Sequence, residues 1–232
     1  MASPQMDVAR REVQGITAPL ERRALRALAE RMPAWVTPDG LTAVGFVAQI
    51  GAGAAYALAG DDRRWLHAVN LCLLANWFGD SLDGSLARFR NESRPRYGFY
   101  LDHMVDALGA FFLLGGMGLS GLLDARLAAG LLIVYFLMNI NVYLATHTRG
   151  VFKISYGAFG GTELRILLAL ANLAAFAWPE VRLAGLELGL FDVFALFGLG
   201  GLGVVLTRSI VQNARFLAEE ERLDKRERPP GS

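Results

Sequence analysis

Four aspartates lie within 27 residues of a chain whose flanking sequence is strongly apolar. Asp80 and Asp83 are separated by three positions. Asp102 and Asp106 are separated by four, so each pair would project from one face of a helix. An aspartate at the centre of a spanning helix costs about 2.5–3.5 kcal/mol, and four would cost on the order of 10 kcal/mol if left unpaired. The cluster therefore predicts a site for a metal ion or for a transported cation.

The two aspartate pairs are joined by a short connection, so the helices that carry them would be antiparallel neighbours. Asp102 and Asp106 follow Gly98 by four and eight residues, which is roughly 6–12 Å along a helix axis. The four carboxylates can therefore converge in one pocket near the helix ends. Oxygen-only ligands suit hard cations such as Mg²⁺ or Mn²⁺, and four carboxylates fit two ions that stabilise a phosphoryl group in transfer.

The residues between the aspartates indicate a phosphorylated ligand. Gly84 and Ala87 are small and lie on or beside the aspartate face, where they would let a ligand approach the backbone closely. Arg88 follows, and its guanidinium can bind a phosphate through two hydrogen bonds. Together with the metal ligands, these residues predict a diphosphate site.

The composition is that of an integral membrane protein. The 232 residues are 53% hydrophobic with a mean hydropathy of +0.34, and apolar runs of about 20 residues recur along the chain. We therefore predict an all-α integral membrane fold with six transmembrane helices, at residues 41–59, 65–86, 98–122, 127–146, 162–178 and 186–211.

Lysine and arginine are distributed unevenly around these helices. Of the 23 basic residues, 19 fall before the first helix, in the 2–3 and 4–5 connections or after the sixth helix. Basic residues favour the cytoplasmic side of a membrane. Both termini and the carboxylate pocket are therefore expected to be cytoplasmic, in a protein of the bacterial cytoplasmic membrane.

Three regions are expected along the chain. Residues 1–37 form a cytoplasmic N-terminal segment, in which apolar residues alternate with arginines over 16–32. That pattern indicates an amphipathic helix on the membrane surface or, equally, a solvated helix packed on the loops. Residues 38–214 form the six-helix catalytic domain, and residues 215–232 form a charged cytoplasmic tail, of which residues 218–232 are expected to fray.

The spacing of the candidate site residues resembles a known signature. Positions 80–106 contain Asp-x-x-Asp-Gly-x-x-Ala-Arg and then Gly-x-x-x-Asp-x-x-x-Asp, which resembles the signature of the CDP-alcohol phosphatidyltransferase family. The six-helix layout is similar to that of the family over nearly the whole chain. One departure is that nine residues separate Arg88 from Gly98, where the family usually has eight. We expect the extra residue to bulge without moving the aspartates.

The resemblance implies a reaction and a set of roles. An alcohol would attack the β-phosphorus of a CDP-linked donor, and CMP would leave. Asp106 would act as the general base that takes the proton from the acceptor hydroxyl. By the same resemblance, two Mg²⁺ or Mn²⁺ ions would be held by Asp80, Asp83, Asp102 and Asp106, and the nucleotide would contact Asp80, Gly84, Ala87 and Arg88.

Further residues are candidates for substrate or partner contacts. Arg149, Lys153 and Arg165 could hold an acceptor that carries a phosphate, or could simply mark the cytoplasmic side. The glycine-rich run 198–203 lacks charge, which favours close helix packing and a homodimer seam over a phosphate loop.

Two classes of function stay open at this point. The first is phospholipid synthesis from CDP-diacylglycerol and a small polar alcohol or, in reverse, from CDP-choline or CDP-ethanolamine and diacylglycerol. The second is a cation transporter, which would favour acids near mid-membrane and internal repeats. Membrane lipid is an expected partner, and nucleic acid is not.

Overall fold

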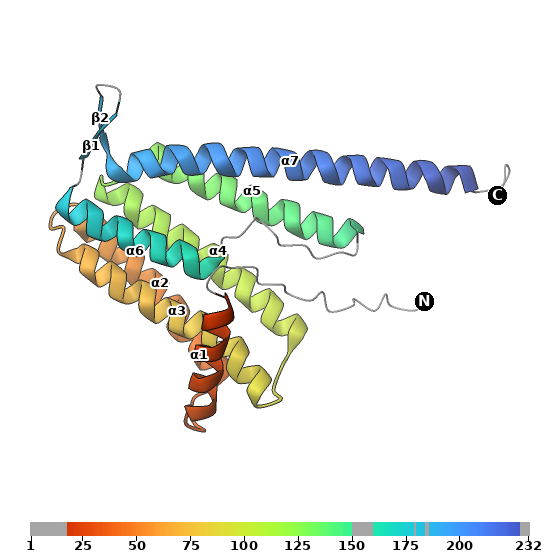
Figure 1. The fold of residues 1–232 in the computed structure, drawn as a ribbon, viewed down its shortest axis with the longest axis horizontal. Helices are drawn as coiled ribbons and strands as arrows, with labels where there is room; N and C mark the ends of the chain where they lie inside the picture. Colours follow the sequence, from red (N-terminus) through yellow and green to blue (C-terminus); the bar gives the residue numbers. More distant parts are fainter. Residues whose placement is uncertain (1–17, 150–159, 179, 184–185, 228–232) are drawn as a thin grey trace.

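A computed structural model describes residues 18–149, 160–178, 180–183 and 186–227 and shows a bundle of long helices (Figure 1). The described residues form seven helices and one hairpin of two strands. The helices are α1 (Ala18–Arg31), α2 (Pro38–Ala59), α3 (Trp65–Phe89), α4 (Pro95–Ser120), α5 (Ala125–Arg149), α6 (Gly161–Ala177) and α7 (Leu190–Glu227), and the strands are β1 (Glu180–Leu183) and β2 (Leu186–Gly189).

The helices follow the apolar runs of the sequence closely. Each of the six predicted helices is present, and α1 lies within the predicted amphipathic segment. Two helices begin at prolines, Pro38 in α2 and Pro95 in α4, where the missing N–H group leaves no hydrogen bond unmade. Thr37 caps α2, because its Oγ1 accepts a hydrogen bond of 3.1 Å from the Gly40 N–H group.

The start of the last predicted helix was wrong. Residues 186–189 form β2, which pairs antiparallel with β1, and α7 begins only at Leu190. Charged and apolar residues alternate over 180–183 and again over 186–188, which is the period of a strand and not of a helix. The fold is therefore helical except for this hairpin.

The end of the last helix also differs from the expectation. α7 continues to Glu227 without a break, so the segment expected to fray from residue 218 is helical over most of its length. Residues 215–227 are rich in Ala, Leu, Glu, Arg and Lys, which are strong helix formers. Pro229 and Pro230 then follow in the sequence. The division into three regions stays a prediction.

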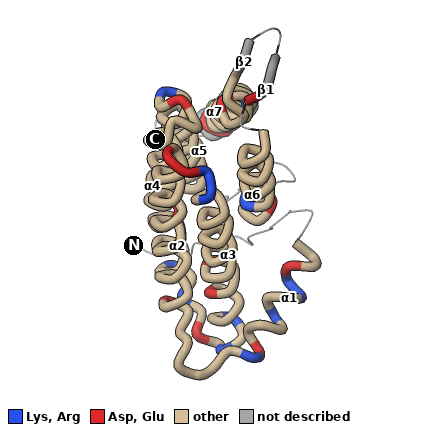
Figure 2. Tube along the Cα trace, turned by 90° about the vertical axis from the view of Figure 1, so that its left-hand side faces the viewer, with Lys and Arg blue, Asp and Glu red and all other residues tan. Residues whose placement is uncertain are grey.

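Within the described residues, four helices are long and apolar enough to cross a membrane: α2, α4, α5 and α7. α3 has 25 residues, but Asn70, Asn76 and the two aspartates lower its hydropathy, and α6 has 17 residues. Both nevertheless lie in the bundle, α3 along α2 and α6 against α3 (Figures 1 and 2). The protein is an integral membrane protein, and the count of six spans stays a prediction that this packing supports.

Connections that are far apart in the sequence meet at one end of the bundle. A Cβ atom on Gly60 would lie 2.2 Å from the Ser120 carbonyl oxygen, so the ends of α2 and α4 touch. The Asp124 N–H group donates a hydrogen bond of 2.7 Å to Asp192 near the start of α7. These contacts agree with the alternating helix directions that the charge distribution predicts.

α2 is in close backbone contact with both helices that carry the aspartates. A Cβ atom on Gly79 of α3 would lie 2.5 Å from the Gly45 nitrogen of α2, and one on Gly116 of α4 would lie 1.9 Å from the Gly53 carbonyl oxygen. The first contact lies next to Asp80 in the sequence. Glycine at these positions lets the helices approach more closely than any side chain would permit.

α1 packs against the end of the bundle near the aspartates. Two of its buried residues, Leu25 and Ala29, belong to one apolar cluster with Leu41, Leu82 and Leu86 of α2 and α3. The guanidinium of Arg90 donates hydrogen bonds to the carbonyl oxygens of Val36 and Pro33, which hold the α1–α2 connection against the end of α3.

The close contact between α2 and α4 predicts a sharp difference between two adjacent glycines. Gly116→Ala places a methyl group on the Gly53 backbone and should lower the free energy of unfolding by about 1–3 kcal/mol. Gly115→Ala is the matched control, because a Cβ atom there meets nothing within 4 Å. Thermal unfolding in detergent measures both, and equal midpoints for the two variants would contradict the packing.

Candidate active site

The two aspartate pairs come together because a tight connection reverses the chain between α3 and α4. Only residues 90–94 join the two helices, and Asn91 has a φ of 58°, in the left-handed region that asparagine tolerates. Gly98, expected to open its helix, lies inside the first turns of α4, which begins at Pro95. The prediction that these two helices are direct neighbours was wrong, because α3 and α4 both pack closely on α2 and make few contacts with each other.

Three of the four aspartates form one group. Asp80, Asp102 and Asp106 each offer a carboxylate oxygen, and these oxygens all lie within 4.8 Å of one another. All three residues are partly buried. An all-oxygen set at this spacing suits a divalent cation such as Mg²⁺ or Mn²⁺.

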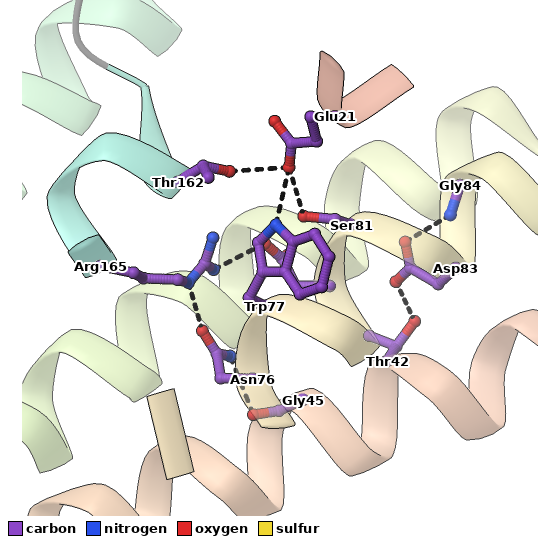
Figure 3. A network of polar contacts seen from close by, with 11 residues as sticks. Glu21, Thr42, Gly45, Asn76, Trp77, Ser81, Asp83, Gly84, Thr162 and Arg165 are labelled. Atoms are coloured by element: carbon purple, nitrogen blue, oxygen red, sulfur yellow. Dashed lines mark hydrogen bonds and ion pairs between the residues drawn. The ribbon is translucent and has the colours of Figure 1, made fainter. Parts of the chain in front are cut away.

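The fourth aspartate, Asp83, is turned toward α2 and is not part of that group. The Thr42 hydroxyl donates a hydrogen bond of 2.5 Å to its Oδ2, and the Gly84 N–H group donates to its Oδ1 (Figure 3). The structure therefore brings three of the four predicted ligands together, and Asp83 lies outside this group. Asp83 is held beside the group by its contact with α2.

A guanidinium group contacts the carboxylate cluster directly. Arg165 of α6 donates a hydrogen bond of 2.7 Å to Asp80 Oδ2 and a second of 2.7 Å to Asn76 Oδ1 (Figure 3). Asn76 is buried, and its Nδ2 donates 2.9 Å to the Gly45 carbonyl oxygen of α2. This chain of polar contacts joins α6, α3 and α2 and fixes the orientation of Asp80.

A second carboxylate organises the α1 side of the site. Glu21 Oε1 accepts hydrogen bonds from Trp77 Nε1 at 2.8 Å, from Ser81 Oγ at 3.1 Å and from Thr162 Oγ1 at 2.7 Å (Figure 3). The donors come from α3 and from the first turn of α6. Glu21 therefore links α1 to the helix that carries Asp80 and to the helix that carries Arg165.

The small residues of the aspartate face leave space over the backbone of α3. Gly84 and Ala87 lie on the part of α3 that is only partly covered. The guanidinium of Arg88 folds back over Gly84, because its Nη1 lies 3.3 Å from the position a Cβ atom there would take. Arg88 also donates 3.2 Å to Ser85 Oγ. These residues form a surface next to the carboxylates on which a ligand can rest.

A family model for CDP-alcohol phosphatidyltransferases matches residues 35–209, which include every residue of this site except those of α1. The chain belongs to the CDP-alcohol phosphatidyltransferase family. No curated protein matches the sequence. The match to the family model confirms the resemblance that the signature motif indicated.

Membership of the family establishes the class of reaction. The protein is a transferase of phospholipid synthesis that moves a group from a CDP-linked donor to an alcohol. The family is metal-dependent, and the donor set formed by Asp80, Asp102 and Asp106 fits the metal chemistry, because it consists of carboxylate oxygens from two adjacent helices.

The three basic residues suggested for acceptor binding lie in different surroundings in this transferase. Arg165 is at the carboxylate cluster. Arg149 lies at the end of α5, where its Nη1 donates 2.7 Å to Asn213 Oδ1 and its guanidinium stacks over the Phe216 ring at 4.0 Å, so it contacts α7. Lys153 lies outside the described residues.

Sequence reasoning missed two residues that position the site of the transferase. Glu21 shares one helix face with Leu25 and Ala29, because the three are spaced by four residues. An acidic residue on the buried face of an amphipathic helix was the available signal. Asn76 precedes Asp80 by four residues and lies on the aspartate face of α3, so its polar side chain was a comparable signal.

Removing the Glu21 carboxylate should loosen α1. Glu21→Ala leaves three donors on α3 and α6 without their acceptor, which should lower the free energy of unfolding by about 1–3 kcal/mol and increase proteolytic cleavage near α1. Glu30→Ala is the matched control on the same helix, because Glu30 is exposed and pairs with Arg26 of that helix. Cleavage rates and unfolding midpoints that are equal for both variants would contradict this role.

Proposed function

We propose that the protein transfers a phosphatidyl group from CDP-diacylglycerol to a small polar alcohol and releases CMP. The observation that carries the proposal is the group of Asp80, Asp102 and Asp106 on two helices of a chain that belongs to this family. A lipid donor is consistent with an active site built at the ends of membrane helices.

We propose that two metal ions would be held by Asp80, Asp83, Asp102 and Asp106. Asp106 would contribute to holding the second ion. Mg²⁺ or Mn²⁺ held there would neutralise the diphosphate of the donor and make CMP a better leaving group. Asp83 is supported as a ligand by its place beside the group, where Thr42 and the Gly84 N–H group hold its carboxylate.

The reaction requires one proton acceptor in the protein. The acceptor alcohol loses its hydroxyl proton to the Asp106 carboxylate while its oxygen forms a bond to the β-phosphorus of the donor. The bond between this phosphorus and the oxygen of CMP breaks, and CMP leaves with the electron pair. The products are the phosphodiester lipid and CMP. The protein contributes chiefly by holding the reactants in line.

The donor nucleotide is assigned to the surface formed by Asp80, Gly84, Ala87 and Arg88. The absence of side-chain bulk at Gly84 lets the nucleotide approach the backbone of α3. Arg88 lies over Gly84, where its planar guanidinium suits a phosphate. Among the candidates for acceptor binding, Arg165 is the best supported, because its guanidinium is in contact with Asp80.

The membrane arrangement completes the proposal. We place six helices across a bacterial cytoplasmic membrane, with both termini and the active site in the cytoplasm. Homodimer formation through α7 is supported by Gly200, Gly201 and Gly203, where a Cβ atom would meet nothing within 4 Å, so that this stretch of α7 can receive another helix closely.

One assay separates the substrates. Purified protein is incubated with Mg²⁺, CDP-diacylglycerol and, in turn, inositol phosphate, glycerol phosphate, serine or choline, and CMP is measured. We expect CMP release to require one of these alcohols and to stop when a strong chelator removes the metal. A parallel incubation supplies CDP-choline or CDP-ethanolamine with diacylglycerol. CMP release only in that incubation would favour the reversed reaction, and full turnover with chelator would contradict the metal site.

Two isosteric substitutions test the assigned roles. Asp106→Asn removes the proton acceptor and should lower the rate at least about 100-fold, with little change in the unfolding midpoint. Asp80→Asn keeps an oxygen for Arg165 but removes a metal-binding charge, so the Mg²⁺ concentration that gives half-maximal rate should rise about tenfold or more. Asn141→Ala, in the α5–α7 contact, serves as a control. Unchanged CMP release in both aspartate variants would refute the assignments.

A further inference from the structure

Three arginines surround a cavity on a different side of α3 from the carboxylates. The cavity has a volume of about 360 Å³ and lies between α1 and the last turns of α3. None of the described residues that line it is acidic. They are Arg22, Arg26 and Ala29 of α1 and Ser85, Arg88 and Phe89 of α3.

The hydrogen bonds of Arg22 and Arg26 leave donors available to a ligand. Arg22 uses its Nε on the Ala18 carbonyl oxygen, and Arg26 uses its Nε on Glu30. Within the described part of the chain, the terminal Nη atoms of Arg22 and Arg26 contact no acceptor. The guanidinium groups of Arg22 and Arg26 both lie at this cavity, so an anion bound there would be attracted by two positive charges.

The cavity is distinct from the metal cluster, although the two are near each other. At about 100° per residue, Ser85 and Phe89 are turned by about 140° and 180° around the axis of α3 from Asp80. A diphosphate held at the carboxylates therefore lies on another face of the helix. Arg88, turned by about 80°, lies between the two faces.

The lining combines charge with apolar surface, which favours a lipid over a free phosphate. Phe89 forms part of the wall and is half exposed, and Ala29 adds a second apolar contact. Trp35, which follows α1, is 82% exposed, and tryptophan prefers the headgroup level of a membrane. A phospholipid presents a phosphate and an apolar chain at that same level.

We propose that this cavity binds the phosphate headgroup of an anionic phospholipid, which acts as an accessory ligand separate from the donor. Its phosphate accepts hydrogen bonds from the terminal Nη groups of Arg22 and Arg26, and its apolar part lies along Phe89. The bound lipid holds α1 against α3. Because Glu21 of α1 contacts Trp77, Ser81 and Thr162, the lipid thereby steadies the helix that carries Arg165 and favours activity.

Lipid binding is measured first, without any substrate. Delipidated protein is titrated with phosphatidylglycerol, with phosphatidylcholine and with inorganic phosphate, and bound ligand is counted by native mass spectrometry. The test variant is Arg22→Gln with Arg26→Gln, which leaves Arg88 intact. The matched control is Arg23→Gln with Arg31→Gln, which removes the same charge from exposed positions of the same helix that do not line the cavity.

We expect the wild type and the control to prefer phosphatidylglycerol to phosphatidylcholine, and the test variant to lose affinity for phosphatidylglycerol about tenfold or more. If both double variants lost affinity for phosphatidylglycerol equally, the lipid would be attracted by the overall charge of α1 and not by a specific site, and the proposal would be overturned. Equal binding of the two lipids would also overturn it, as would inorganic phosphate binding as tightly as phosphatidylglycerol.

Activity gives the second readout. CMP release is followed in nanodiscs at a constant fraction of donor while phosphatidylglycerol replaces phosphatidylcholine. The rate should rise several-fold in the wild type and the control. In the test variant it should stay at the value measured in phosphatidylcholine without phosphatidylglycerol. A parallel rise in all three proteins would overturn the accessory role. If no protein released CMP, the proposed function would fail, while the titration would still decide whether the lipid site exists.

Discussion

The structure depends on holding like charges close together inside an apolar bundle. Carboxylate oxygens of Asp80, Asp102 and Asp106 lie within 4.8 Å of one another, and their repulsion is stronger among apolar helices than in water. Arg165 offsets part of this charge through its contact with Asp80, and the metal ions that the family requires would offset more. Because the carboxylates repel one another, α3 and α4 must be held together by contacts made elsewhere.

Those contacts are made through α2. Gly45 and Gly79 bring α2 and α3 into backbone contact, and Gly53 and Gly116 do the same for α2 and α4. Both helices that carry aspartates therefore rest on one common support. A site built on packed helices holds its geometry better than one built on loops, and here the closest packing lies directly beside Asp80.

α1 and α6 contact the site without being part of the α2–α3–α4 packing. α6 supplies Arg165, and α1 supplies Glu21, whose three hydrogen bonds join the ends of α3 and α6. α1 also carries arginines on the side that faces the cavity at the end of α3. α1 thus contacts the catalytic helices through the Glu21 carboxylate, and in the proposed lipid site it binds a headgroup through its arginines. Binding of an anionic lipid to α1 would therefore affect the active site.

The sequence by itself determined the family, the carboxylates and the positions of most helices, because apolar periodicity, capping and residue spacing are local properties of the chain. It could not determine contacts between distant segments. Arg165 meets Asp80 across 85 residues and Thr162 meets Glu21 across 141, and Asp83 turns toward α2 although it shares a face with Asp80. Such contacts depend on how each helix is rotated and how closely it crosses its neighbours, and only the packed tertiary structure decides these.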